Sequence, residues 1–570
     1  MRVCHFITNP YSFDTRVKKE SATLRGMGCD VTVVGTRGRG LPPRSREDGV
    51  RVQRVDPKTY SAGELVRFIG VVGRDTLGGT FLWRPLEFIG RSITGTIRFG
   101  KDLVQQVQQI FRRVGSIIVR RFRGGPEADI DLSAALLDAL STESRMPLRA
   151  HAIWWLGLLL AILVLPLLPV FILLGMLIFA VVPVFRFARR TALKAARRVY
   201  RLAGRNASRV VGTFARVTRP GRNLMFRFNR NLALIDAGYR ADPNVYQAND
   251  YDTILVTWIV SRLRGVPYVY DIHELYDESF PTRKPFRVRY FIRLLEGRLA
   301  RRALHTITVG AEIARVMSER YRIPPPVLVR NAQPYEGAAV ANDYLRTTIG
   351  DADRPERRTI FIYAGRVARG RGLPEAVAAM QSIDPDEGAL IIMGSGDPSR
   401  IADLERQIVD LDLSDRVYVL PGIPSEDLPS ALADADVGLM LTQPACLSYY
   451  YGLGNKLFHY VNAGIPVLVP DQPEKRQFIE EHRVGMMVED LTPDGIAATM
   501  QRFIDDPERT EMFKSRCRQV APTVAWEHEA DRYESVYVDV YEHVLFDRPK
   551  TNVARRGKTL GLGSAQWSPA

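Results

Sequence analysis

Cysteine is scarce in this chain of 570 residues, which has only Cys4, Cys29, Cys446 and Cys517, none at a spacing typical of metal ligands. This scarcity excludes a disulfide-rich scaffold and a cysteine-based zinc site. The first ten residues, MRVCHFITNP, lack the apolar core of a signal peptide and have the pattern of a β-strand. We therefore expect a reduced, cytosolic setting.

Charged residues are absent from the 33 positions of residues 153–185, IWWLGLLLAILVLPLLPVFILLGMLIFAVVPVF. Such hydrophobicity is typical of a segment within a bilayer. Acidic residues are absent from the adjoining residues 186–230, which carry 14 lysines and arginines. A basic run can bind nucleic acid or anionic lipid, and the apolar neighbour favours lipid.

Strand and helix patterns alternate on both sides of that apolar segment. The first part has a predicted helix at residues 14–27 and predicted strands at residues 2–7, 30–34 and 50–55. The pattern stops near residue 57 and resumes with a helix at 253–264 and strands at 245–248, 267–271, 305–309 and 327–330. The second half has predicted strands at 360–364, 390–393, 417–420, 437–441, 467–469 and 486–488. Repeated βα units predict parallel sheets covered by helices on both faces.

The predicted fold class is α/β, with two Rossmann-like doubly wound domains facing a cleft into which the carboxyl ends of the strands point. The expected segments are an N-terminal domain in two parts (1–56 and 241–340), a membrane-associating insertion (57–240), a C-terminal domain (341–524), a helix returning to the first domain (525–548) and a disordered tail (549–570).

Both parts of the split domain must lie on one side of the membrane, because they share a sheet. As one helix, 33 residues would measure about 50 Å against an apolar core of about 30 Å, and two full crossings need about 40 residues. Pro166 and Pro169 divide the run into two short pieces. We expect a re-entrant hairpin at residues 153–185, on the cytosolic face of the cell membrane, with positive charge at both ends. Two short tilted spans are the alternative, which cysteine labelling at Leu167 would distinguish.

Glycines and cations follow two successive predicted strands: Gly365, Arg366 and Arg371 after the first, and Gly394, Ser395 and Gly396 after the next. Cations at a strand end suit a diphosphate, and glycines allow a phosphate to approach closely. Taken singly, such an arginine is commonly a surface residue and Gly-Ser-Gly commonly a turn. Their order along the chain carries more information than any one of them.

The chain resembles the retaining family-4 glycosyltransferases of the GT-B fold in the order of GRVARGRGL, MGSGDP, LPSALADADVGLML, GLGNKLFHYVNAGIPVLVPD and WEHEADRYESVYVDVYEHVL. The N-terminal half is similar to the same family in DTRVKKESATLRGMGCDVTVVG, ANDYDTILVTW and PYVYDIHELYDESF. The resemblance covers most of residues 1–56 and 240–546. It implies sugar transfer from a nucleotide diphosphate sugar with retention, without a metal or other cofactor.

The resemblance also implies roles for individual residues. Arg366 and Arg371 match the cations on the donor diphosphate, with Arg371 in place of the usual lysine, and Asn455 and Lys456 match the start of the donor-side helix. The donor-binding set further includes Gly365, Gly394, Ser395 and Gly396. The resemblance implies Asp14, Arg16, Asp271 and Glu274 on the acceptor side, and a catalytic set of Arg366, Arg371, His273 and Asp250. His273 is equally compatible with a structural hydrogen bond at a strand end.

Besides Arg371, three positions depart from the family, and one of them is Asn249, which replaces the histidine of the usual His-Asp pair. Aligned on the Gly-Ile-Pro-Val segment, Tyr451 and His459 replace two glutamates, and histidine lacks the carboxylate that holds a ribose. The first hypothesis is a membrane-associated glycosyltransferase that binds a nucleotide sugar, anionic lipids and a lipid-linked or surface-polysaccharide acceptor, and no nucleic acid. The second is a catalytically impaired GT-B scaffold that recruits assembly partners, and an epimerase ranks third. Three Asp-x-Asp patterns, including residues 434–436, are not interpreted as metal sites.

Overall fold

The computed structural model describes residues 1–12, 14–57, 68, 226–279, 285–352, 357–424 and 427–546. The predicted hairpin at 153–185, most of the basic segment and the tail at 549–570 lie outside these residues. The chain divides into two compact units, Met1–Val55 with Ala237–Ala570, and Asp56–Asp236. None of the helices in the described ranges has the length and apolar character that crossing a bilayer requires.

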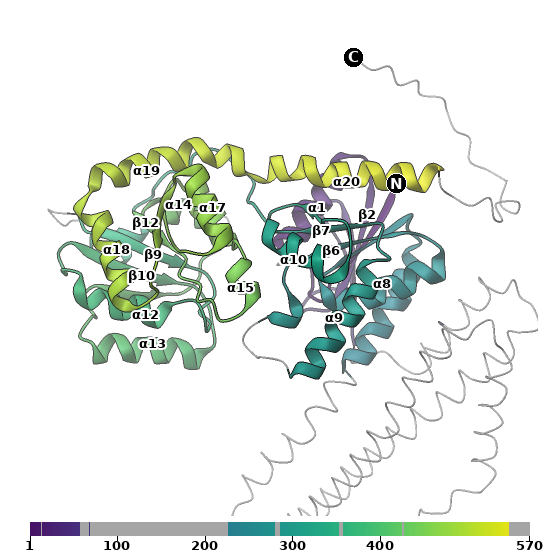
Figure 1. Ribbon diagram of the computed structural model, residues 1–570, viewed down its shortest axis with the longest axis horizontal. Coiled ribbons are helices and arrows are strands. Elements are labelled where there is room, and N and C mark those ends of the chain that lie inside the picture. Colours follow the sequence, from purple (N-terminus) through teal and green to yellow (C-terminus); the bar gives the residue numbers. More distant parts are fainter. Residues whose placement is uncertain are drawn as a thin grey trace, which may run out of the picture. The chain divides into compact units, whose positions relative to one another are not determined.

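An eight-stranded sheet in the order β3-β4-β2-β1-β5-β6-β7-β8 forms the N-terminal lobe (Figure 1). All its neighbouring strands are parallel except β3 and β4. The elements are β1 (Arg2–Phe6), α1 (Thr15–Gly26), β2 (Asp30–Thr36), β3 (Arg44–Glu47), β4 (Val50–Val55), β5 (Val245–Asn249), α8 (Tyr251–Arg264), β6 (Tyr268–Ile272), η2 (Tyr276–Glu278), α9 (Phe286–Ala300), β7 (His305–Thr308), α10 (Ala311–Tyr321) and β8 (Val327–Leu328). Because β1 pairs with both β2 and β5, segments on either side of the insertion share one sheet.

Strand β3 is absent from the sequence prediction. Its residues, Arg-Ser-Arg-Glu, show no apolar alternation, so no strand period is visible. The turn that joins β3 to β4 contains Asp48 and Gly49, both with positive φ (49° and 78°). An Asp-Gly pair with that geometry is typical of a tight hairpin, and it is the one sequence signal that could have revealed the strand.

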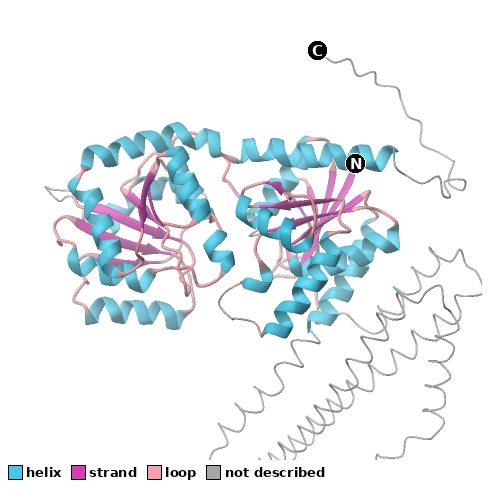
Figure 2. Ribbon diagram, in the orientation of Figure 1, coloured by secondary structure: helices cyan, strands magenta, loops and turns pink. Residues whose placement is uncertain are grey.

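A six-stranded parallel sheet in the order β11-β10-β9-β12-β13-β14 forms the C-terminal lobe (Figure 2). Its elements are α11 (Tyr344–Thr348), β9 (Thr359–Ala364), α12 (Leu373–Ala379), η3 (Met380–Ser382), β10 (Gly388–Met393), α13 (Pro398–Asp410), β11 (Val417–Leu420), α14 (Leu428–Ala433), β12 (Val437–Leu439), α15 (Leu447–Tyr451), α16 (Asn455–Asn462), β13 (Val467–Pro470), α17 (Pro473–His482), β14 (Gly485–Val488), α18 (Pro493–Asp505), α19 (Pro507–Val520) and η4 (Ala521–Val524). The predicted α/β class with parallel sheets is confirmed.

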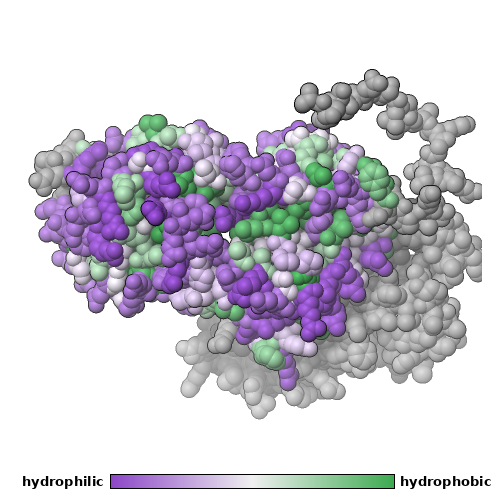
Figure 3. Space-filling model, turned by 45° about the horizontal axis from the view of Figure 1, so that its top comes forward, coloured by the Kyte–Doolittle hydropathy of each residue, from purple (hydrophilic) through white to green (hydrophobic). Residues whose placement is uncertain are grey.

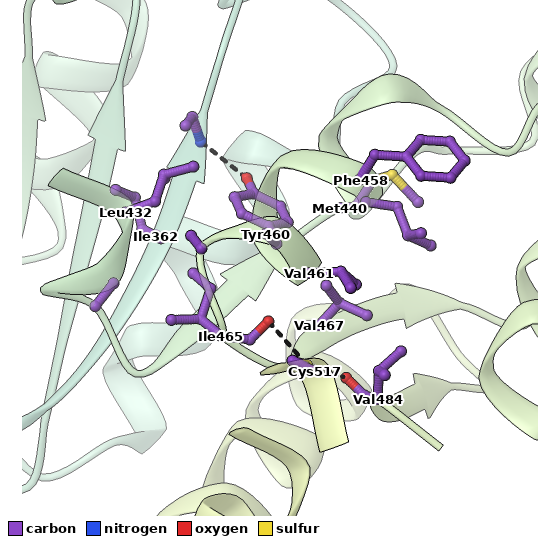
Figure 4. Close-up of a cluster of buried hydrophobic side chains, with 14 of the residues drawn as sticks. Ile362, Leu432, Met440, Phe458, Tyr460, Val461, Ile465, Val467, Val484 and Cys517 are labelled. Carbon is purple, nitrogen blue, oxygen red and sulfur yellow. Dashed lines mark hydrogen bonds between the residues drawn. The ribbon is translucent and has the colours of Figure 1, made fainter. Parts of the chain in front are cut away.

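Alternate residues of the central strands enter two separate apolar clusters. Along β9, Ile360 and Ile362 belong to one cluster and Phe361 and Tyr363 to the other. Figure 4 shows part of the first cluster, where side chains of β9, α14, α16 and β13 interlock. Both faces of this sheet are therefore buried, as is usual for parallel sheets. The molecular surface drawn in Figure 3 is mostly hydrophilic, with smaller apolar patches.

Helix α20 (Trp526–Phe546) follows the second lobe and packs on the first, beside α1 (Figure 1). The indole of Trp526 donates a hydrogen bond to the Thr23 hydroxyl at 3.1 Å. The hydroxyls of Tyr533 and Tyr537 both donate to the side-chain oxygen of Gln247 in β5, at 2.7 and 2.5 Å. The C-terminal helix thus satisfies a polar group in the centre of the N-terminal sheet.

Tyr460 connects the core of the C-terminal lobe to the end of β9. Its fully buried hydroxyl accepts a hydrogen bond from the Ala364 N–H at 2.9 Å and donates to the Leu439 carbonyl at 3.1 Å (Figure 4). We expect Tyr460→Phe to lower the free energy of unfolding by about 1–3 kcal/mol, because a buried N–H loses its acceptor. Tyr344→Phe, at a partly exposed tyrosine, is the matched control and should cost less than about 0.5 kcal/mol. Equal losses in denaturant unfolding would contradict the assignment.

Candidate active site

The loops after β9 and β10 meet at the carboxyl edge of the C-terminal sheet. The Gly365 N–H donates to the Met393 carbonyl at 2.8 Å, and the Val367 N–H donates to the Ser395 carbonyl at 2.9 Å. A Cβ on Gly394 would lie 2.0 Å from the Gly365 carbonyl oxygen. Only glycine allows the two loops this close approach, so the two glycine motifs predicted to bind phosphate form one continuous edge.

Two cations lie close to this edge. The Lys456 Cε lies 2.7 Å from the point that a Cβ on Gly365 would occupy, and its Nζ is 4.7 Å from the ring centroid of Tyr363. The Arg371 guanidinium is 4.9 Å from the ring centroid of Tyr449. Its Nε is buried and has no hydrogen-bond partner among the described residues. This buried N–H donor can therefore bond to a group that enters the site.

The electrostatics of these cations favour an anion. Burial, and then the charge of Arg371, lower the pKa of Lys456 to about 7. The two side chains therefore repel each other, and a bound diphosphate would relieve that repulsion and restore the charge on Lys456.

The remaining predicted donor residues lie on the same loops or on α15 and α16. Arg366 is exposed on the loop after β9, and Asn455 is exposed at the first turn of α16, whose N-terminus is capped by no side chain of the described residues. His459 lies one turn further along α16, and burial followed by the charges of Lys19 and Lys456 lowers its pKa to about 4. It is therefore neutral at pH 7. Tyr451 lies in α15, its ring edge-on to Tyr450 at a centroid distance of 5.2 Å.

Four side chains of alternating charge lie in a row near the carboxyl ends of β5 and β6. These are Arg16, Asp271, His273 and Asp250, and together they are called the acid–base chain. Arg16 donates through Nε and Nη2 to both carboxylate oxygens of Asp271, at 2.8 and 2.9 Å. His273 places Nε2 2.7 Å from Asp271 Oδ2 and Nδ1 2.7 Å from Asp250 Oδ1. The structure thus joins Arg16 to three residues that lie between positions 250 and 273.

His273, the histidine of the acid–base chain, is an imidazolium at neutral pH. Burial alone would lower the pKa of His273, but the carboxylates of Asp250 and Asp271 outweigh it and raise that pKa well above 6.5. The Asp271 side chain is fully buried, whereas that of Asp250 is 41% exposed. The carboxylate of Asp250 is therefore the end of the acid–base chain that is accessible from solvent.

The backbone at Asp250 is strained. Its φ of 70° and ψ of 159° fall in a region that is occupied almost only by glycine, at a cost on the order of 1–3 kcal/mol. The carboxylate is fixed by His273 and by the hydroxyl of Tyr276, which donates to the same oxygen. Strain of this kind is concentrated at active sites, where it holds a group in a working geometry.

Two predicted acceptor-side residues lie outside this chain of charges. Asp14 caps α1, accepting hydrogen bonds from the Val17 N–H at 3.1 Å and the Asn9 amide at 2.6 Å. Glu274 is exposed on the loop after His273. The sequence analysis did not identify Tyr276, Tyr363 and Tyr449 as site residues. The signal that could have indicated them is that each lies in, or within a few residues of, a segment named for the family resemblance.

The Asp-x-Asp residues 434–436 have structural partners. The Asp434 carboxylate accepts from the N–H groups of Asn342, Asp343 and Leu345, at 2.7, 2.8 and 3.0 Å. The Asp436 carboxylate contacts Arg346 and Lys514, at 2.9 and 2.7 Å. Among the residues that the structure describes, no group of three or more His, Cys, Asp or Glu side chains is arranged to hold a metal ion.

Two doubly wound lobes, one with cations beside a glycine edge and the other with the acid–base chain, are the architecture of the GT-B glycosyltransferases. Residues 347–520 match the family model for glycosyl transferases group 1, and residues 211–332 match the glycosyl transferase 4-like domain. The chain therefore contains a group 1 glycosyltransferase domain and a glycosyl transferase 4-like domain.

Named relatives agree with these domain matches, and a solved structure shares the fold. The α-D-kanosaminyltransferase of Streptomyces kanamyceticus is 26% identical over 50% of this chain and 73% of its own length. A GDP-mannose-dependent α-(1-6)-phosphatidylinositol monomannoside mannosyltransferase of Mycolicibacterium smegmatis is 28% identical over 29% of this chain and 42% of its own length. Sucrose-phosphate synthase of Thermosynechococcus elongatus shares the fold, with a TM-score of 0.57, 13% identity and coverage of 95% of this chain and 99% of that chain. The predicted GT-B fold is confirmed.

Proposed function

We propose that this enzyme transfers a sugar from a nucleotide diphosphate sugar, with retained anomeric configuration, to a lipid-linked or surface-polysaccharide acceptor at the cytosolic face of the cell membrane. The observation that carries the donor assignment is the convergence of Lys456 and Arg371 on the edge formed by Gly365 and Gly394. Side-chain cations there neutralise the departing diphosphate, so the reaction needs no metal ion or other cofactor.

The acceptor assignment is supported by the sequence and by one relative. The uncharged residues 153–185 and the basic run after them suit a bilayer with anionic lipids. The mannosyltransferase of M. smegmatis is named for a phosphatidylinositol monomannoside acceptor. An acceptor hydroxyl is expected to meet the exposed carboxylate of Asp250 and to donate a hydrogen bond to it, while His273 holds that carboxylate in place.

A panel of nucleotide sugars incubated with the full chain and cell membranes tests this proposal. The expected result is a mass increase of one sugar on extracted lipid or polysaccharide, with an α product from an α donor by NMR and an unchanged rate in EDTA. The scaffold alternative, favoured by Tyr451 and His459, predicts no transfer from any donor and no thermal stabilisation by UDP or GDP. That outcome would overturn the proposal.

Donor affinity is expected to fall as the pH rises through about 7. Burial and Arg371 lower the pKa of Lys456 to about 7 in the free enzyme, and the diphosphate binds best to the charged amine. Between that pKa and the higher pKa of the complex, binding should weaken by about tenfold per pH unit. Calorimetry with UDP-glucose and GDP-mannose, whose diphosphates are diesters and do not titrate in this range, measures the effect. Lys456→Arg should remove the pH dependence; a slope that persists in it would contradict the assignment to Lys456.

A further inference from the structure

Large apolar side chains are concentrated on the exposed surface of one helix. In α9 the exposed fractions are 76, 45, 58, 60 and 40% for Phe286, Val288, Tyr290, Phe291 and Leu294. Four of the five, at 286, 290, 291 and 294, share one face at helical spacing. The opposite face is buried through Ile292, Leu299 and Ala300 where α9 packs on α8 and α10.

The charges on α9 are divided between the same two faces. Arg287 and Arg298 are exposed among the apolar side chains. Arg289 and Arg293 instead form ion pairs with the acidic residues of η2. The only carboxylate of the helix, Glu296, is buried and accepts hydrogen bonds from two buried tyrosines. The exposed face therefore combines aromatic and aliphatic groups with cations and contains no acidic group.

We propose that this α9 face, formed by Phe286, Arg287, Tyr290, Phe291, Leu294 and Arg298, docks on the surface of an anionic bilayer. The proposal rests on the proposed function at a membrane and names the surface of the N-terminal lobe that contacts it. Aromatic and aliphatic side chains enter the head-group boundary, and the long arginine side chains reach the lipid phosphates. Charge complementarity favours anionic lipid, because cations without any carboxylate repel a second copy of the same face.

Docking through α9 would hold the acid–base chain at a fixed distance from the surface of the bilayer. Residues of η2 link the two regions: Tyr276 donates a hydrogen bond to Asp250, while Asp277 and Glu278 pair with arginines of α9. The carboxylate of Asp250 is thus connected to the docking helix through one short turn. A lipid-linked sugar at the head-group plane would meet this carboxylate without leaving the interface.

A fluorescent label on α9 tests the proposal in the full chain. Phe291→Cys is labelled with the environment-sensitive dye NBD after Cys29 and Cys446 are replaced by serine. Val409→Cys, at a 67% exposed position on α13 of the other lobe, carries the control label. Vesicles of phosphatidylglycerol with phosphatidylcholine are compared with phosphatidylcholine alone, and sedimentation with the vesicles is measured in parallel.

The expected result is a blue shift at position 291 with anionic vesicles, quenched by nitroxides on the lipid chains, and no change at position 409. If the chain sediments with anionic vesicles while the label at 291 is unaffected, the docking face is wrong and membrane association stands. If the chain sediments with neither vesicle, the membrane part of the proposed function fails as well. A blue shift that grows with protein concentration in the absence of vesicles would show that a second copy covers the face, which also overturns the proposal.

Discussion

Replacing Lys456 with methionine is expected to lower kcat/KM for the nucleotide sugar by about 10²–10³-fold, because one cation that stabilises the leaving diphosphate is lost. Methionine fills the space that the lysine stem occupies against Gly365 and over Tyr363. The fold should therefore persist while the charge disappears. Steady-state kinetics with the active donor, together with a melting curve of the variant, measures the two effects separately.

The control for charge is Lys514→Met. Lys514 pairs with Asp436 in the same lobe and belongs to none of the site residues, so its loss should leave kcat/KM unchanged. Arg371→Met should resemble Lys456→Met, since its guanidinium presents a buried, unpaired N–H. A loss below about threefold in Lys456→Met, with Lys514→Met equal to it, would mean that other groups neutralise the diphosphate.

The donor edge was predictable because its signals are local. The strands before Gly365 and Gly394 are apolar runs that end in glycine, and such runs define both the strand and the loop after it. The position of Arg371 follows from the same motif. The aromatic rings under the two cations were not predictable from the sequence. Tyr363 lies in a different element from Lys456, and Tyr449 in a different element from Arg371, and only the folded structure brings each pair together.

The acid–base chain required the structure. Arg16 and Asp271 lie 255 positions apart, and no spacing rule relates them. Sequence similarity placed both on the acceptor side but could not show that Arg16 is buried behind Asp271 and that Asp250 faces solvent. The same reasoning grouped Asp14 with them, although its hydrogen bonds are those of a helix cap.

The returning helix α20 also gains a physical role. The side-chain oxygen of Gln247 accepts hydrogen bonds from the hydroxyls of Tyr533 and Tyr537 in α20. Its amide nitrogen donates a hydrogen bond to the Glu20 carboxyl at 2.9 Å. Burial, and then the nearby charge of Asp271, raise the pKa of Glu20 well above its usual value, which favours its protonated form. The Glu20 carboxyl lies 2.9 Å from the Arg16 Nε, so the layer behind Arg16 and Asp271 is connected through Gln247 to the last helix of the chain.

His273→Gln is expected to lower kcat by about 10²-fold, the cost of misplacing a group at the site, because Asp250 loses the imidazolium that holds it. Glutamine can bond to one carboxylate but carries no positive charge, so Asp250 and Asp271 lose the cation between them. His528→Gln, at an exposed histidine of α20, is the control and should retain full activity.

The pH dependence of stability separates this charge role from simple packing. The pKa of His273 is raised in the folded state, so its stabilising contribution is complete below the unfolded value of 6.5 and is lost as the pH rises through the folded value. Asp250→Asn removes one of the two carboxylates that raise this pKa, so the loss should be complete at a lower pH than in the parent enzyme. NMR titration of the His273 ring and urea unfolding from pH 6 to 10 measure both quantities. An unchanged ring pKa in Asp250→Asn would show that His273 does not depend on Asp250 for its charge.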